Sequence, residues 1–337
     1  MKKKVTRICP GIFVISILLA SPLLNHACGN VVTDESQYAL LDSPTPPQQP
    51  PTGPGGSNYS HAGVIVHSYG VGALQYWIFE PTDPKPATAP LIVFNHGFWA
   101  AFPFWYQTWI NHIVKRGNIV VYPRYQQTSL LGIFHFYLNA ITAVKNALHE
   151  LEQGDHVKPE LDHFAIVGHS FGGGITCDMA VLAESEGLPI PKAIMPVQAG
   201  FWLTNLSLIP GSILMIVIYG EDDPLVKEWM EKKIFYGADK IPLENKDFVI
   251  QVTDKYGTPD LIADHSAPLT PTIPLAGFGK TDAMDYYSTW KLFDALTDYA
   301  FYGINREYCF GNTSEQRFMG LWSDGTPVKE LKVTDSP

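Results

Sequence analysis

The segment GHSFGG, residues 168–173, constrains the fold of this chain more than any other part of the sequence. An apolar run, 164–167, leads into it, and a stretch of small residues, 172–180, leads out. This pattern predicts a strand, a sharp turn and a helix, with Ser170 at the turn. Side chains two residues before and two after a serine in such a strained turn would collide, which explains the glycines there. The turn is expected to expose the Ser170 hydroxyl and to aim the Phe171 N–H at any oxygen that the serine attacks.

From residue 58 to residue 337 the sequence alternates between expected strands and expected helices. This alternation predicts a single α/β domain with a largely parallel central sheet and helices on both of its faces. An apolar content of 46% is ample for the core of one large domain. The expected strands are 63–67, 73–79, 91–95, 118–122, 164–167, 193–197, 213–219 and 248–252, and the expected helices are 107–115, 131–151, the one after Ser170, 224–235 and 283–302.

The first 27 residues have the features of a secretory signal peptide. Three lysines and Arg7 form a positive start, and an apolar stretch follows over 8–24. Ala27 precedes Cys28, as in signals after which the cysteine becomes the lipidated first residue. Asn25 stands where such signals prefer leucine, so cleavage without lipidation is the alternative. We expect a location in the cell envelope or outside the cell, with a lipid anchor favoured.

Residues 28–57 are rich in proline and end in Gly55-Gly56-Ser57, which predicts a linker. Such a segment suits a tether between a lipid anchor and a folded domain, although a tail without function would look the same. Beyond the linker, Cys177 and Cys309 remain, and they either form a disulfide in an oxidising compartment or stay as buried thiols.

The residues around Ser170 resemble the α/β-hydrolase superfamily, and GHSFGG in particular resembles platelet-activating-factor acetylhydrolases. The surroundings are similar to dienelactone hydrolases, chlorophyllases and bacterial polyester hydrolases. The resemblance follows the order of elements over residues 60–305 and implies a serine hydrolase of the α/β-hydrolase fold. It also implies that an acidic residue and then a histidine follow the serine along the chain.

The resemblance implies a second contribution to the site from His96-Gly97, which directly follows the expected strand 91–95. In the superfamily this loop supplies a second backbone donor to the developing negative charge, here the N–H of Phe98. His96 itself is expected to brace the loop through hydrogen bonds, because the order of the chain favours a later histidine as the base.

The expected acid and base lie in two further loops. The superfamily pattern G-x-x-D-x-x-V, counted from Gly220, selects Asp223, with Asp222 as the competitor. His265 is the only histidine after Gly220, so it is the expected base, oriented by the acid. Histidines that precede Ser170, such as His67 and His156, are expected to be surface or core residues.

Aromatic and polar residues gather where strands are expected to end. Trp99 follows His96-Gly97, and Gln198 and Trp202 follow the expected strand 193–197. These three residues are predicted to line the substrate cleft, although packing in the core would also explain such a group.

Composition and motifs exclude several classes of function. The net charge of −10 argues against nucleic acid as a partner. The chain has no HExxH, paired CxxC or phosphate-loop pattern, so no metal and no cofactor are predicted.

The expected function is hydrolysis of carboxylic esters, small or of the lipid or polyester type, with membrane contact only through the N-terminal anchor. Hydrolysis of a lipid, thioester or peptide is the alternative within enzymes. A non-catalytic binding lipoprotein of the envelope is the alternative outside them.

Overall fold

The structure is a computed structural model that describes residues 43–127, 132–271 and 279–337. Residues 43–337 form one compact unit. The predicted signal peptide and Cys28 lie outside the described residues. No helix in the described ranges is long and apolar enough to cross a membrane.

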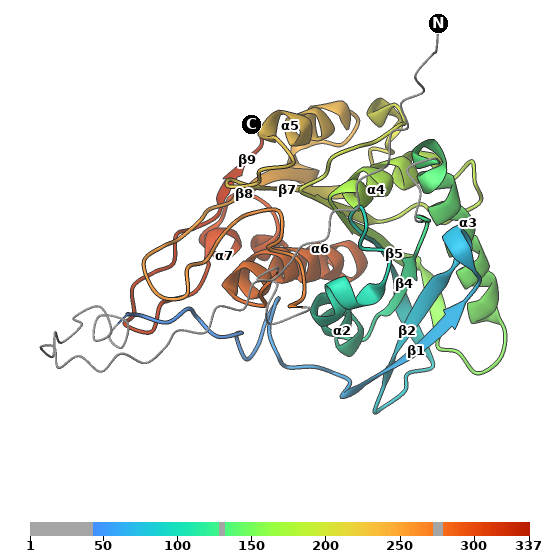
Figure 1. Cartoon of the computed structure of the whole chain (residues 1–337), viewed down its shortest axis with the longest axis horizontal. Coiled ribbons are helices and arrows are strands. Elements are labelled where there is room, and N and C mark those ends of the chain that lie inside the picture. Colours follow the sequence, from blue (N-terminus) through green and yellow to red (C-terminus); the bar gives the residue numbers. More distant parts are fainter. Residues whose placement is uncertain (1–42, 128–131, 272–278) are drawn as a thin grey trace, which may run out of the picture. The chain divides into compact units, whose positions relative to one another are not determined.

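A single sheet of nine strands forms the centre of the described unit, in the order β1-β2-β4-β3-β5-β6-β7-β8-β9 (Figure 1). The strands from β3 to β8 pair in parallel, whereas β1, β2 and β9 pair antiparallel at the two edges. This confirms the predicted α/β fold with a mostly parallel sheet. The strands are β1 Gly63–Tyr69, β2 Tyr76–Thr82, β3 Thr88–Asn95, β4 Ile119–Pro123, β5 Lys158–His169, β6 Ala193–Val197, β7 Leu214–Gly220, β8 Lys246–Gln251 and β9 Lys332–Thr334.

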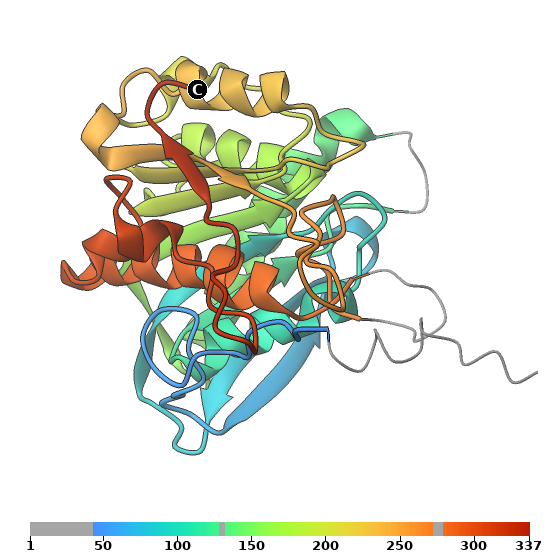
Figure 2. The ribbon, with the colours of Figure 1, turned by 90° about the vertical axis from the view of Figure 1, so that its left-hand side faces the viewer.

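Helices cover both faces of the sheet (Figure 2). Successive side chains of a strand point to opposite faces, and both sets are apolar here, so both faces need a covering layer. Leu91 and Val93 of β3 pack in one apolar cluster with α3, α4 and α5, while Ile92 and Phe94 pack in the other with α2 and α6. The helices are α2 Gln107–Lys115, α3 Phe136–Glu152, α4 Phe171–Leu182, α5 Glu228–Gly237, α6 Trp290–Tyr302 and α7 Ser314–Arg317, with a π-helical turn η6 Asp285–Thr289 before α6 and 3₁₀ turns η1 Gly72–Leu74, η2 Pro103–Tyr106, η3 Ile133–His135, η4 Leu206–Leu208, η5 Leu243–Asn245 and η7 Arg306–Tyr308.

The structure differs from the sequence prediction at the start of α5. The helix begins at Glu228 rather than at Pro224. The side chain of Asp223 accepts hydrogen bonds from the N–H groups of Leu225 and Val226, at 2.7 and 2.9 Å. These bonds hold the segment after Pro224 in a turn, so the helix starts later.

A second difference concerns the predicted linker, whose residues 43–57 lie within the compact unit. The N–H of Gly55 donates to Asp294 of α6 at 2.7 Å, and the carbonyl of Pro44 accepts from Thr258 at 2.8 Å. Its many prolines favour an extended chain, and here the extended chain is held by residues distant in sequence.

The two cysteines in the described ranges, Cys177 and Cys309, are both buried and free. Burial raises the pKa of each thiol well above its ordinary value. Of the two alternatives left open by the sequence, buried thiols describe this structure.

Candidate active site

Ser170 lies in the turn between β5 and α4, as predicted from the sequence. Its backbone has φ 57° and ψ −124°, a region that residues with side chains rarely adopt. The adjacent glycines are needed because a Cβ on Gly168 would collide with the carbonyl of Gly172, and one on Gly172 with that of Asn95. β3 and β5 run in register with Asn95 opposite Gly168, so the loops after both strands meet beside Ser170.

His265 joins two of the other residues that the sequence singled out. Its Nε2 lies 2.8 Å from Ser170 Oγ, and its Nδ1 lies 2.7 Å from Asp223 Oδ2. Asp223 is buried, and its second oxygen accepts the two backbone hydrogen bonds at the start of the next turn. The carboxylate therefore faces the imidazole in a fixed orientation, which favours the tautomer with a proton on Nδ1 and a free electron pair on Nε2.

Asp222, the competing acid, has a different partner. Its Oδ2 accepts a hydrogen bond of 2.7 Å from Thr253 Oγ1, at the end of β8. The Thr253 N–H in turn donates to Glu221 at 2.7 Å. Glu221 and Asp222 therefore link the end of β7 to that of β8, and neither is hydrogen-bonded to His265.

The loop after β3 is anchored on both sides of Phe98. The N–H of Gly97 donates to Tyr106 Oη and that of Trp99 donates to Gln126 Oε1, both at 2.9 Å. Among the described residues no acceptor is found for the Phe98 N–H. The Phe171 N–H is the first of α4, where helical amides have no acceptor within the helix. Both amides are thus available to a ligand.

His96 is buried beneath this loop and has the bracing contacts expected of it. Its Nδ1 and Nε2 each lie 2.6 Å from a carbonyl oxygen, those of Gly97 and Arg124. Its ring stacks on Tyr125 with the ring centres 3.9 Å apart. Burial lowers the pKa of His96 to about 4.

Comparison with known proteins supports the fold and the class of enzyme. The family described as chlorophyllase matches residues 73–197, a range that holds the loop after β3 and the turn at Ser170. The chain is an α/β-hydrolase esterase. No curated protein matches it. The family match ends with β6, so Asp223 and His265 lie outside it. Their assignment to the site therefore depends on their contacts alone.

A second histidine, His169, lies directly beside His265, and the sequence analysis did not identify it as part of the site. His169 is buried, with its ring centre 4.7 Å from that of His265. Its Nδ1 lies 2.8 Å from Tyr106 Oη, and its Nε2 lies 3.1 Å from Gln198 Oε1. Burial, together with the nearby His265, lowers the pKa of His169 well below its ordinary value. His169 is therefore a neutral neighbour of the imidazole that contacts Ser170.

The prediction that Gln198 of the esterase lines the cleft is wrong. The residue is fully buried, and its amide nitrogen donates to the carbonyl of Asp264 at 2.7 Å. With a neutral His169, the donors and acceptors form one consistent chain from the Gly97 N–H through Tyr106, His169 and Gln198 to the loop of His265. Gln198 thus ties the loop of His265 to the end of β6. From the sequence alone, only the position of Gln198 after a strand could be seen.

A cavity of about 440 Å³ opens over Ser170 and His265 of the esterase. Trp99 lines it, as predicted from the sequence, and is 57% exposed. Trp202 does not line this cavity, because it packs half-buried against the apolar cluster that includes α3 and α4. The remaining lining residues are mostly apolar or aromatic: Gly97, Phe98, Ala100, Trp105, Tyr106, His169 and Leu269.

Proposed function

We propose that this protein is an extracytoplasmic serine esterase that cleaves carboxylic esters through an acyl-enzyme on Ser170. The observation that carries the proposal is the single imidazole of His265, hydrogen-bonded on one side to Ser170 and on the other to buried Asp223. This arrangement gives a hydroxyl a base and gives the base an orienting carboxylate.

The reaction begins when Ser170 Oγ attacks the ester carbonyl and passes its proton to His265 Nε2. Asp223 stabilises the imidazolium through the hydrogen bond to Nδ1. The imidazolium then gives the proton to the leaving alcohol as the C–O bond breaks. Water attacks the acyl-enzyme with His265 again as base, and the acid is released with the Ser170 hydroxyl restored.

The backbone amides of Phe98 and Phe171 are the proposed donors to the tetrahedral oxyanion. Two N–H groups that converge on the developing charge stabilise the transition state more than the substrate. The anchored amides of Gly97 and Trp99 keep Phe98 in place, so the donor is positioned before the substrate binds. A single missing donor in such a site costs about 10²–10³ in turnover.

The cavity favours esters with an apolar or aromatic group next to the scissile bond. Its walls come from Phe98, Trp99, Trp105 and Leu269, and its volume of about 440 Å³ suits a small acyl or aryl group. In a lipid or polyester substrate, the cavity would hold only the apolar group next to the bond being cleaved. The proposed partner is therefore an apolar ester, small or polymeric.

The proposed location outside the cytoplasm rests on the sequence. The positive start, the apolar stretch over 8–24 and the Ala27-Cys28 junction favour a lipoprotein signal, from which only Asn25, in the place of the usual leucine, departs. An anchor at Cys28 would hold the esterase at a membrane surface.

The proposal is tested by labelling the folded protein with a fluorophosphonate and assaying chromogenic esters of graded acyl length, with a polyester film included. We expect stoichiometric labelling at Ser170 and loss of both labelling and hydrolysis in Ser170→Ala. The variant should melt within about a degree of the wild type, because the hydroxyl contributes little packing. Folded wild-type protein that neither labels nor hydrolyses any ester would instead favour a binding lipoprotein.

A further inference from the structure

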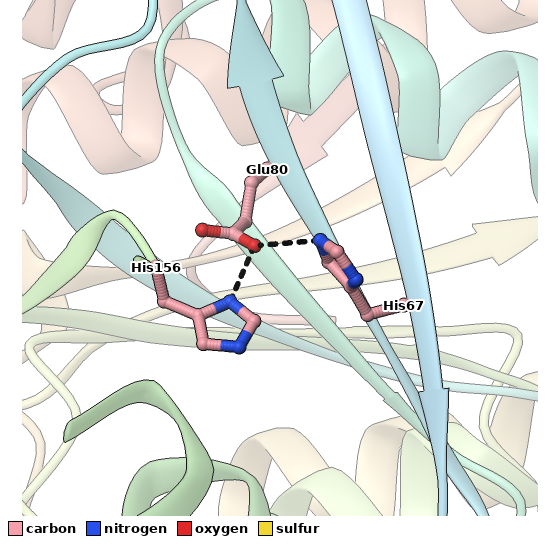
Figure 3. Close-up of side chains that lie close together, drawn as sticks. All are labelled: His67, Glu80 and His156. Atoms are coloured by element: carbon pink, nitrogen blue, oxygen red, sulfur yellow. Dashed lines mark hydrogen bonds and ion pairs between the residues drawn. The ribbon is translucent and has the colours of Figure 1, made fainter. Parts of the chain in front are cut away.

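Three ligand-type side chains meet at the edge of the sheet formed by β1 and β2 (Figure 3). His67 lies on β1, Glu80 on β2, and His156 in the connection from α3 to β5. One nitrogen of each histidine and one oxygen of Glu80 lie within 4.8 Å of one another. The three residues come from separate segments, so no local motif marks them in the sequence.

The two histidines approach the same oxygen of Glu80. His156 Nδ1 lies 2.7 Å and His67 Nε2 lies 3.5 Å from Glu80 Oε1. The dashed lines in Figure 3 mark these two contacts. The other oxygen, Oε2, accepts a hydrogen bond of 2.6 Å from the Val157 N–H. Glu80 is 1% exposed, so its carboxylate is held in one orientation with Oε1 directed at the imidazoles.

We propose that His67, Glu80 and His156 bind a divalent transition cation, with zinc as the preferred ion. Two imidazoles and one carboxylate form a ligand set that zinc accepts, with water in the fourth position. Ligand atoms around tetrahedral zinc lie about 3.3 Å apart, given bond lengths of about 2.0–2.1 Å. The two separations from Glu80 Oε1, 2.7 and 3.5 Å, bracket that value, and all three ligand atoms lie within 4.8 Å of one another, so the histidine side chains would have to rotate to close the site around the ion.

A further contact supports the proposed site. Tyr69 Oη lies 3.1 Å from His156 Nε2, the nitrogen that faces away from Glu80. With zinc on Nδ1, the ring carries its proton on Nε2, and this N–H donates to Tyr69 Oη, which fixes the orientation of the ligand.

The site lies away from Ser170. β3 and β5 pair with Thr88 opposite Lys158 at their amino ends, and His156 directly precedes β5, whereas Ser170 follows the opposite end of that strand. Bound zinc would therefore join the edge hairpin of β1 and β2 to the start of β5. Its role is to stabilise the sheet, and ester hydrolysis does not depend on it.

The experiment is calorimetric titration of the chelator-treated full-length protein with Zn²⁺, together with thermal unfolding with and without the ion. We expect the wild type to bind one zinc ion. His67→Gln should bind zinc with at least about 100-fold lower affinity, and zinc should raise the Tm of the wild type but not that of this variant. His67 is about one-third exposed, so this variant should fold. Tyr69→Phe should bind about 10-fold more weakly.

His163→Gln is the matched control. His163 Nδ1 also lies 2.7 Å from a glutamate oxygen, that of Glu160, but no third ligand joins this pair in the described residues. The His163→Gln variant should bind zinc as the wild type does. Equal zinc binding by the wild type and His67→Gln, or no binding by the wild type, would overturn the proposal. Ester hydrolysis measured on the same samples should be the same in His67→Gln as in the wild type.

Discussion

Asp222 and Asp223 are adjacent in the chain, yet their carboxylates serve different partners. Asp223 Oδ2 lies 2.7 Å from His265 Nδ1, while Asp222 Oδ2 accepts a bond of the same length from Thr253 Oγ1. Asp222 lies in a turn closed by the Asp223 N–H, which donates to the carbonyl of Gly220 at 3.0 Å, and the backbone bonds to the Asp223 side chain fix which residue faces the histidine.

Replacing the two acids should therefore have unequal effects. Asp223→Asn is expected to reduce turnover on the order of 10⁴-fold, because the histidine then takes the wrong tautomer. Asp222→Asn should lose less than about tenfold, since it removes a link between strand ends. The measurement is turnover of one chromogenic ester by both variants, with folding checked by circular dichroism. A larger loss at Asp222 would show that the acid has been misassigned.

The turn at Ser170 should be intolerant of a methyl group at Gly172. Gly172→Ala would place its Cβ against the carbonyls of Asn95 and His96, so β3 and α4 would have to separate. We expect a loss of about 3 kcal/mol or more in the free energy of unfolding. Gly200→Ala is the control, because its Cβ would meet only Val226 Cγ2, at 3.7 Å. Urea unfolding measures both, and equal stabilities would argue against this close packing.

Glu231 should make stability depend on pH. It is fully buried on α5, where Ala199 N–H donates to one oxygen and the other has no partner among the described residues. Burial raises its pKa well above the ordinary value. The folded state therefore favours the protonated form, so the stabilisation is complete below the ordinary pKa and is lost as pH rises through the folded pKa.

Glu231→Gln should remove that dependence, because an amide of the same shape does not ionise. The variant is expected to match the wild type near pH 4 and to exceed it by about 1.4 kcal/mol for each pH unit between the ordinary and the folded pKa. Free energies of unfolding from pH 4 to pH 8 give the test. A difference that stays constant over this range would mean that Glu231 is ionised in the folded protein.

Cys28→Ser tests the proposed anchor. If Cys28 is lipidated, the variant should leave the membrane fraction and appear in the medium or the soluble fraction, because acyl chains are then missing. Fractionation followed by mass spectrometry of the N-terminus measures this. A wild-type protein that itself fractionates as soluble, with an unmodified first residue, would favour ordinary secretion.

The pattern of apolar residues predicts most of this fold because the sheet is buried on both faces. Strands such as β3 then show as continuous apolar runs, and α2 was predicted with its observed bounds because its apolar positions recur with helical spacing. β9 was missed because a strand of three residues carries too little pattern. α5 begins later than predicted because the Asp223 side chain accepts hydrogen bonds from the backbone of the turn before it. Helix propensities do not reveal such bonds.

The candidate site was predictable only where chain order restricts the choice. His265 had no later rival, and Ser170 was marked by its glycines. The contacts of Tyr106, His169 and Gln198 join residues up to 66 positions apart, and the backbone of Gln198, with φ 45°, follows from its tertiary setting. His67, Glu80 and His156 are likewise distant from one another in the sequence.

β1 forms one edge of the sheet, and within the described residues no further strand pairs with its outer row of backbone groups. The edge strand carries Ile65 and Val66, which are 43% and 46% exposed, and no lysine, aspartate or glutamate. Open strand edges of this kind are where sheets of separate molecules join during aggregation, and charged side chains normally oppose this. A cation held by His67 would supply the missing charge, so its removal should lower the concentration at which the protein begins to aggregate.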